Sequence, residues 1–135
     1  MVKGMATGTD PLAHGLALQG RHRWAQAVVE LQRAAEFMPD NPLTWYWLAV
    51  TLDSRGQETE AIPAYRRALG SGLPQEWEAN AWAWLGSSLR KTGRPEEALV
   101  CFATAEQLGY IPQQQLDQFR HLARRALKQA GTLPR

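Results

Sequence analysis

The residues best suited to chemistry are three histidines and one cysteine, and they are scattered along the chain. His14, His22 and His121 belong to three different predicted elements, and Cys101 lies beside Phe102 on a predicted helix. Catalysis or metal binding needs such groups at defined spacings, and the chain has no His-Glu-x-x-His pair, no second cysteine and no glycine-rich phosphate loop. We interpret His14 as a packing residue and Cys101 as an ordinary thiol. The sequence therefore predicts no enzyme activity, no cofactor and no metal site.

Basic residues form a second group with chemical potential, near the C-terminus. Residues 113–135 contain five basic side chains and one acidic one, whereas residues 1–112 contain ten basic and twelve acidic ones. On the predicted terminal helix the basic residues are Arg120, Arg124, Arg125 and Lys128. Such a cluster is typical of phosphate binding, but cations are also favoured near a helix C-terminus, and the net charge is only +2. A solvated helix face is the stronger interpretation, and weak binding of RNA or an acidic partner remains an alternative.

The composition is that of one globular domain. The 135 residues are 44% apolar and 21% charged, a mixture that can bury enough surface to offset the entropy of ordering the chain. A single cysteine excludes an intramolecular disulfide framework. The N-terminus lacks the apolar core of a signal peptide, and no stretch approaches the length of a membrane span. We therefore expect a cytoplasmic protein without a membrane partner.

An internal repeat in the sequence predicts where the helices lie. Ala27, Ala61 and Ala98 are 34 and then 37 residues apart. The same two intervals relate Leu31, Tyr65 and Phe102, and also Ala34, Ala68 and Ala105. These sets put a small, a large and a small residue on one face of a helix in each copy, and a further apolar stripe upstream predicts a second helix. Gly56 and Gly93 fit the left-handed residue that ends the first helix of a pair.

The motif Trp45-x-x-Leu48-Ala49-x-x-Leu52, followed by Ala61-x-x-x-Tyr65, resembles the tetratricopeptide repeat. A second motif, Trp82-x-x-Leu85-Gly86-x-x-Leu89 with Ala98-x-x-x-Phe102, resembles it as well. The resemblance implies an all-α, right-handed α-solenoid of three helix–turn–helix repeats over residues 8–41, 42–75 and 79–112. The first copy departs from the pattern, with Pro11 in place of the tryptophan and His22 in place of the interhelical glycine. The chain is also similar to small stand-alone bacterial tetratricopeptide proteins of unassigned function, which implies a bacterial host and no reaction.

Local departures from the repeat predict local structure. Three extra residues near Trp77 lengthen the link between the second and third copies and predict an extra turn on the helix that follows. Pro63 removes a backbone hydrogen bond inside a helix, and Pro95 marks a helix start. After residue 112 the apolar positions recur every three or four residues, at Leu116, Phe119, Leu122, Ala123, Ala126 and Leu127. This spacing predicts a capping helix over residues 113–130, with tails at 1–7 and 131–135.

The resemblance also implies a binding surface, because the first helix of each pair lines the concave side of such solenoids, where partners dock. The residues at the matching places are Leu12, Leu16, Leu43, Tyr46, Trp47, Val50, Asn80, Trp84, Ser87, Arg90 and Lys91. Relatives that bind chaperone tails hold a carboxylate with Lys, Asn and Arg at five of these places. Here only Asn80 fits, so a chaperone tail is not the expected ligand.

Six tryptophans remain to be assigned. Trp24, Trp45 and Trp82 match packing positions of the repeat, and Trp77 marks the insertion. Trp47 and Trp84 lie two residues beyond packing tryptophans, turned about 200° from the helix-pair core, and are expected to face the groove. The predicted function is a non-enzymatic protein–protein interaction scaffold that binds an apolar or aromatic-containing peptide or helix in this groove. A homodimer, formed through the uncapped N-terminal end or through the groove, is the alternative.

Overall fold

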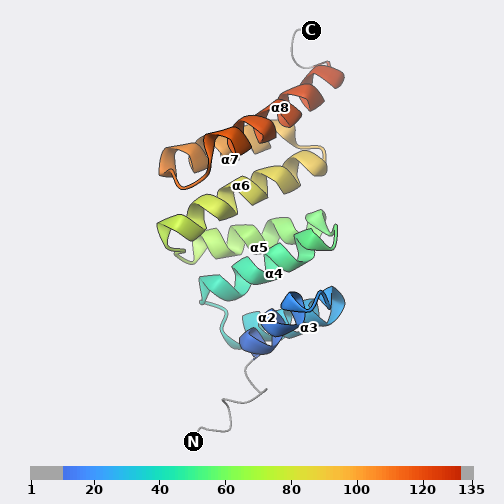
Figure 1. The fold of residues 1–135 in the computed structure, drawn as a ribbon, viewed down its shortest axis with the longest axis vertical. Helices are drawn as coiled ribbons and strands as arrows, with labels where there is room; N and C mark the ends of the chain where they lie inside the picture. Colours follow the sequence, from blue (N-terminus) through green and yellow to red (C-terminus); the bar gives the residue numbers. More distant parts are fainter. Residues whose placement is uncertain (1–10, 132–135) are drawn as a thin grey trace, which may run out of the picture. The chain divides into compact units, whose positions relative to one another are not determined.

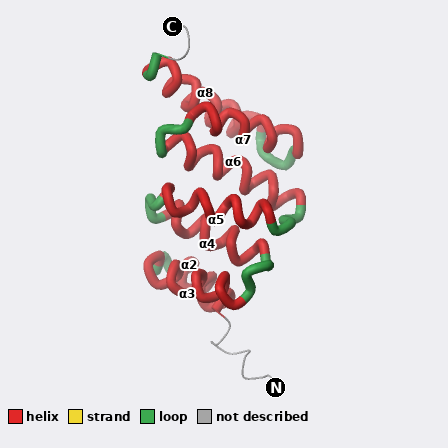
Figure 2. The backbone as a smooth tube through the Cα atoms, turned by 180° about the vertical axis from the view of Figure 1, so that it is seen from behind, coloured by secondary structure: helices red, strands yellow, loops and turns green. Residues whose placement is uncertain are grey.

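A computed structural model describes residues 11–131, and this part of the chain forms seven α-helices and no strand (Figure 1). The helices are α2 (Pro11–Gly20), α3 (Trp24–Phe37), α4 (Pro42–Ser54), α5 (Glu58–Gly70), α6 (Gln75–Lys91), α7 (Pro95–Leu108) and α8 (Gln113–Gln129). Short loops join them (Figure 2). The prediction of an all-α fold built from helix pairs is confirmed. The predicted tail at residues 1–7, the first three residues of the predicted first repeat, and residues 132–135 lie outside the described residues.

The chain divides into two compact units, Met1–Gly72 and Leu73–Arg135. The pairs α2/α3 and α4/α5 belong to the first unit, and α6/α7 and α8 belong to the second. The division falls just before the three-residue insertion in the repeat. As expected from that insertion, α6 is 17 residues long, whereas α4 has 13 residues.

The repeated positions form the core of each helix pair. Leu31 and Phe102 are fully buried, and Tyr65 is 1% exposed. Each of these large side chains is flanked by two alanines from the repeat, all fully buried: Ala27 and Ala34, Ala61 and Ala68, Ala98 and Ala105. Small residues one turn away on both sides let the neighbouring helix approach and let the large side chain fill the space between. The residues that recur in the sequence are therefore the residues that pack between the two helices of each pair.

The turns inside the helix pairs need a left-handed residue, and the three copies supply it differently. Gly56 has φ of 79° and Gly93 has φ of 86°. His22 takes the same conformation, with φ of 58°, although it has a side chain. Its ring lies edge-on to Trp24, with 5.4 Å between ring centroids. The first copy thus keeps the turn without the glycine, at the steric cost that a side chain meets in this region.

Two other glycines are fixed by close packing. A Cβ on Gly86 would clash with the Phe102 ring, lying 2.8 Å from Cδ1, and a Cβ on Gly15 would lie 2.7 Å from Cγ of Leu31. Both positions are in the first helix of a pair and face the large core residue of the second helix. The helices therefore approach so closely that only a glycine fits opposite these side chains.

Candidate functional site

Apolar side chains gather on two neighbouring helices of the first unit. Leu12 and Leu16 are one turn apart on α2, and Leu43, Trp47 and Val50 follow one face of α4. All five are half-buried. We call these five residues the α2–α4 apolar surface.

A hydrogen bond joins the two helices that carry this surface. Gln19 Nε2 of α2 donates to Thr51 Oγ1 of α4 over 2.8 Å, and Thr51 Oγ1 in turn donates to the carbonyl oxygen of Trp47 over 2.7 Å. Thr51 is fully buried. A hydrogen bond in such a shielded place is costly to leave unmade, so the one from Gln19 to Thr51 fixes α2 against α4.

The structure places Tyr46 in the core and not on the predicted groove surface. Tyr46 is 5% exposed, and its ring lies edge-on both to Trp47 (5.3 Å between centroids) and to Tyr65 (6.5 Å). Burial raises the pKa of Tyr46. The physical reason is helical geometry, since position 46 turns toward the second helix of its own pair. Burial, together with the hydrogen bond that the Tyr65 hydroxyl donates to Asp53 Oδ2 over 3.1 Å, also raises the pKa of Tyr65.

The predicted groove residues of the second unit differ in exposure. Ser87 is 4% exposed and therefore belongs to the core, which removes it from the candidate surface. Asn80 and Arg90 are half-buried, and Lys91 is exposed. Trp84 is half-buried, and its ring packs edge-on to Phe119 of α8 at 5.6 Å between centroids. Trp84, which the sequence analysis assigned to partner binding, thus packs against the capping helix α8.

Phe119 is the aromatic residue whose role the sequence analysis missed. Besides Trp84 it contacts Phe102, with ring centroids 5.4 Å apart and a tilt of 39°. Three rings from α6, α7 and α8 therefore meet in the second unit. The sequence did indicate that Phe119 is a packing residue, because it lies on the apolar stripe of the predicted capping helix. The stripe does not show which residues it contacts.

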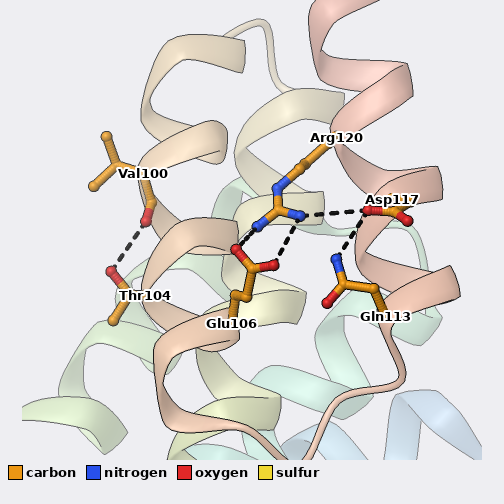
Figure 3. A network of polar contacts seen from close by, with 6 residues as sticks. All are labelled: Val100, Thr104, Glu106, Gln113, Asp117 and Arg120. Atoms are coloured by element: carbon orange, nitrogen blue, oxygen red, sulfur yellow. Dashed lines mark hydrogen bonds and ion pairs between the residues drawn. The ribbon is translucent and has the colours of Figure 1, made fainter.

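One of the four predicted basic residues of α8 is engaged in ion pairs. The Arg120 guanidinium donates to both carboxylate oxygens of Glu106 on α7 and to Asp117 Oδ1, the last at 3.4 Å (Figure 3). Gln113 Nε2 donates to the same Asp117 oxygen over 3.0 Å. The Arg120 side chain is only 15% exposed, so it belongs to the contact between α7 and α8 and not to an open basic face. Arg124, Arg125 and Lys128 are exposed.

This ion pair predicts an acid-sensitive contact between α7 and α8. The hydrogen bonds from Arg120 lower the pKa of Glu106 below its ordinary value. The stabilisation is therefore complete above the ordinary pKa of glutamate and is lost as the pH falls through the lowered value. Glu106→Gln should remove this part of the pH dependence, which urea unfolding between about pH 6 and about pH 3 measures. The exposed Glu96→Gln on the same helix is the control, and equal pH profiles for the two variants would contradict the prediction.

Among residues 11–131 the three histidines are exposed and the cysteine is buried. His14 is an exposed residue and not the predicted packing residue, and its Nδ1 lies 3.4 Å from Glu30 Oε1. Cys101 is buried. In the described part of the chain no group of three or more His, Cys, Asp or Glu side chains is arranged to hold a metal ion. The helices of that part are too short or too polar to cross a membrane.

Each helix pair has a left-handed residue in its turn and a large core residue flanked by two alanines. These repeated features define a helix–turn–helix repeat protein. The family model described as "Tetratrico peptide repeat" matches residues 43–130. The chain belongs to the tetratricopeptide repeat family. Members of this family generally mediate protein–protein interactions.

Solved structures agree with this assignment. The crystal structure of the Sgt2 TPR domain from Aspergillus fumigatus is 18% identical, with a TM-score of 0.74 over 93% of this chain and 83% of that one. The crystal structure of MamA is 14% identical, with a TM-score of 0.67 over 97% of this chain and 86% of that one. At these identities the likeness shows the fold, which is that of the all-α helical-repeat solenoids.

Proposed function

We propose that the protein is a non-enzymatic interaction scaffold that holds an apolar or aromatic-containing peptide or helix on the α2–α4 apolar surface. The observation that supports this is the grouping of five half-buried apolar side chains on two helices that the Gln19–Thr51 hydrogen bond joins. A ligand that covers them removes the remaining apolar area from water, and full burial of one such side chain contributes roughly 1.5–3 kcal/mol. A helix or extended peptide with apolar residues at matching spacing provides this cover.

Trp47 is the proposed anchor of the ligand. Its ring rests edge-on against Tyr46, which in turn rests against Tyr65, and the Tyr65 hydroxyl is bonded to Asp53. This row of contacts limits the orientations of the indole before a ligand arrives, so that binding loses less side-chain entropy. Large, pre-oriented aromatic side chains are typical of the residues that dominate binding energy in protein interfaces.

Val50→Asp is expected to weaken peptide binding at least about tenfold, because it puts a charge into the surface that the ligand must cover. The probes are peptides selected by display from a random dodecapeptide library on the wild-type protein. Fluorescence anisotropy then measures their affinity for each variant. Val100→Asp, at a 65% exposed position on α7, is the matched control and should leave affinity unchanged.

Two outcomes would overturn the proposal. One is equal affinity of the Val50→Asp variant and the wild type for the selected peptides. The other is sedimentation showing that Val50→Asp dissociates a wild-type dimer while no selected peptide binds, which would assign the surface to self-association. A wild-type monomer at all concentrations together with Val50-dependent binding supports the scaffold.

A further inference from the structure

The first unit contains a pocket outside the α2–α4 apolar surface, between α2, α3 and the turn that joins them. Its volume is about 430 Å³, and its walls include His14, Leu18, Arg21, Arg23, Val29 and Glu30. At the helical step His14 lies about 200° around α2 from Leu12, and Leu18 lies about 200° around it from Leu16. The pocket is therefore a separate place on the molecule.

The pocket carries an excess of positive charge. Glu30, its acidic residue, has one oxygen 3.0 Å from Arg33 Nη1 and the other 3.4 Å from His14 Nδ1. Within residues 11–131, neither Arg21 nor Arg23 has an ion-pair partner. Since the Glu30 carboxylate is already balanced by Arg33, two guanidinium groups at the pocket remain available to a ligand.

The backbone that carries the two arginines is fixed. The N–H of Arg21 donates to the carbonyl of Ala17 over 3.2 Å, and the N–H of Arg23 donates to that of Leu18 over 2.9 Å. Between them His22 holds the left-handed conformation and packs its ring against Trp24. A fixed backbone limits the region that the two guanidinium groups can reach, so a ligand that they bind loses less entropy than it would on a mobile loop.

The other repeats lack this combination. One repeat on, the sequence Arg21-His22-Arg23 becomes Arg55-Gly56-Gln57, and in the third copy it becomes Thr92-Gly93-Arg94, where Arg94 is paired in two places with Glu97.

The polar pair His14–Glu30 in the wall is also unique to the first copy. His14 and Glu30 correspond to the buried residues Leu48 and Ala64 in the second copy, and to Leu85 and Cys101 in the third. Two positions that are apolar and buried in the second and third copies thus hold a polar pair in the first. The arrangement is thus a property of this copy and not of the repeat.

We propose that this pocket binds a carboxylate adjoining an aliphatic group, as in a Glu–Leu or Asp–Val step of an acidic segment in a partner protein. The planar guanidinium groups of Arg21 and Arg23 match the two oxygens of a carboxylate. Leu18, which is 8% exposed, and Val29, which is 53% exposed, provide apolar wall for the neighbouring aliphatic side chain. A nucleic acid offers anionic oxygens but no aliphatic side chain for Leu18 and Val29 to contact, and so a peptide is the better match.

Three labelled peptides test the proposal on the full chain. The first is amidated and contains two Glu–Leu steps, the second has glutamine in place of both glutamates, and the third is the glutamine peptide ending in leucine with a free carboxylate. The first should bind with an affinity that falls as salt rises, and the second at least about tenfold more weakly. Binding of the third peptide as well as the first supports recognition of a carboxylate. It would also show that a C-terminal carboxylate can replace the glutamate side chain.

Paired variants locate the binding. Arg21→Gln combined with Arg23→Gln should weaken the first peptide at least about tenfold, whereas Arg55→Gln, at the equivalent place in the second copy, should not change it. Circular dichroism checks that the variants fold. Equal binding of the first and second peptides, an equal loss in Arg55→Gln, or arginine-dependent binding of an RNA oligonucleotide with none of the acidic peptide would overturn the proposal. Val50→Asp should leave this binding intact, which separates it from the proposed function.

Discussion

Gly86→Ala is expected to lower the free energy of unfolding by about 1–2 kcal/mol, although alanine is the better helix former by about 1 kcal/mol. The added methyl group would enter the space of the Phe102 ring. That ring is fully buried and also contacts the Phe119 ring, so it has little room in which to move. Relief therefore requires α6 and α7 to separate, which loosens the core of the second unit. Urea unfolding followed by circular dichroism measures the change.

Gly20→Ala and Gly70→Ala are the controls, because a Cβ at either position meets no atom within 4 Å and neither residue has a positive φ. Both should be neutral or slightly stabilising. Adding Phe102→Leu to Gly86→Ala should cost less than the sum of the two single changes, since the smaller side chain makes room for the methyl group. Strict additivity would show that the clash is not the cause.

Phe119→Ala is expected to detach α8 and to cost about 2–4 kcal/mol, because the half-buried ring loses somewhat less than the roughly 3–5 kcal/mol of a fully buried aromatic residue. It removes the ring that contacts both Trp84 and Phe102. Because α8 is the last described helix, the loss should be local: amide hydrogen exchange should speed up in α8 more than in α6 or α7. The fluorescence of the protein should shift to the red as Trp84 enters water.

Leu122→Ala is the matched change on the same helix, at a residue that is 39% exposed. It should leave both exchange and fluorescence close to wild type. Uniform acceleration of exchange over α6, α7 and α8 in Phe119→Ala would instead mean that the second unit unfolds as a whole.

The sequence predicts the helices well because the repeated spacing of small and large residues determines both the sequence pattern and the packing of the helices. The interval that relates Leu31, Tyr65 and Phe102 marks residues that are almost completely buried, and each brings its alanine neighbours with it. Pro95 and the glycine turns add local signals, and these appear as a helix start and as positive φ angles. Such signals depend on short segments of the chain, so one sequence is enough to recognise them.

The candidate site was predicted less well, because exposure depends on the elements that cover a residue. Helical spacing separates Trp84 from the packing tryptophan beside it, but it does not show that Phe119 will cover it. Likewise, spacing puts Arg120 on α8, and only the fold brings Glu106 of α7 to it. The arginines beside His22 drew no prediction, since the pocket needs both α2 and α3 in place.

The three helix pairs are not interchangeable, and this bears on how the chain finds its correct partners during folding. Gly15 faces Leu31 and Gly86 faces Phe102, whereas the matching positions of the second copy hold Ala49 and Tyr65. If α4 paired with α7, the methyl group of Ala49 would meet a ring that tolerates only glycine. Chains of similar repeats are prone to pairing out of register, and unequal core residues penalise such mistakes. This irregularity of the repeat therefore disfavours the pairing of α4 with α7.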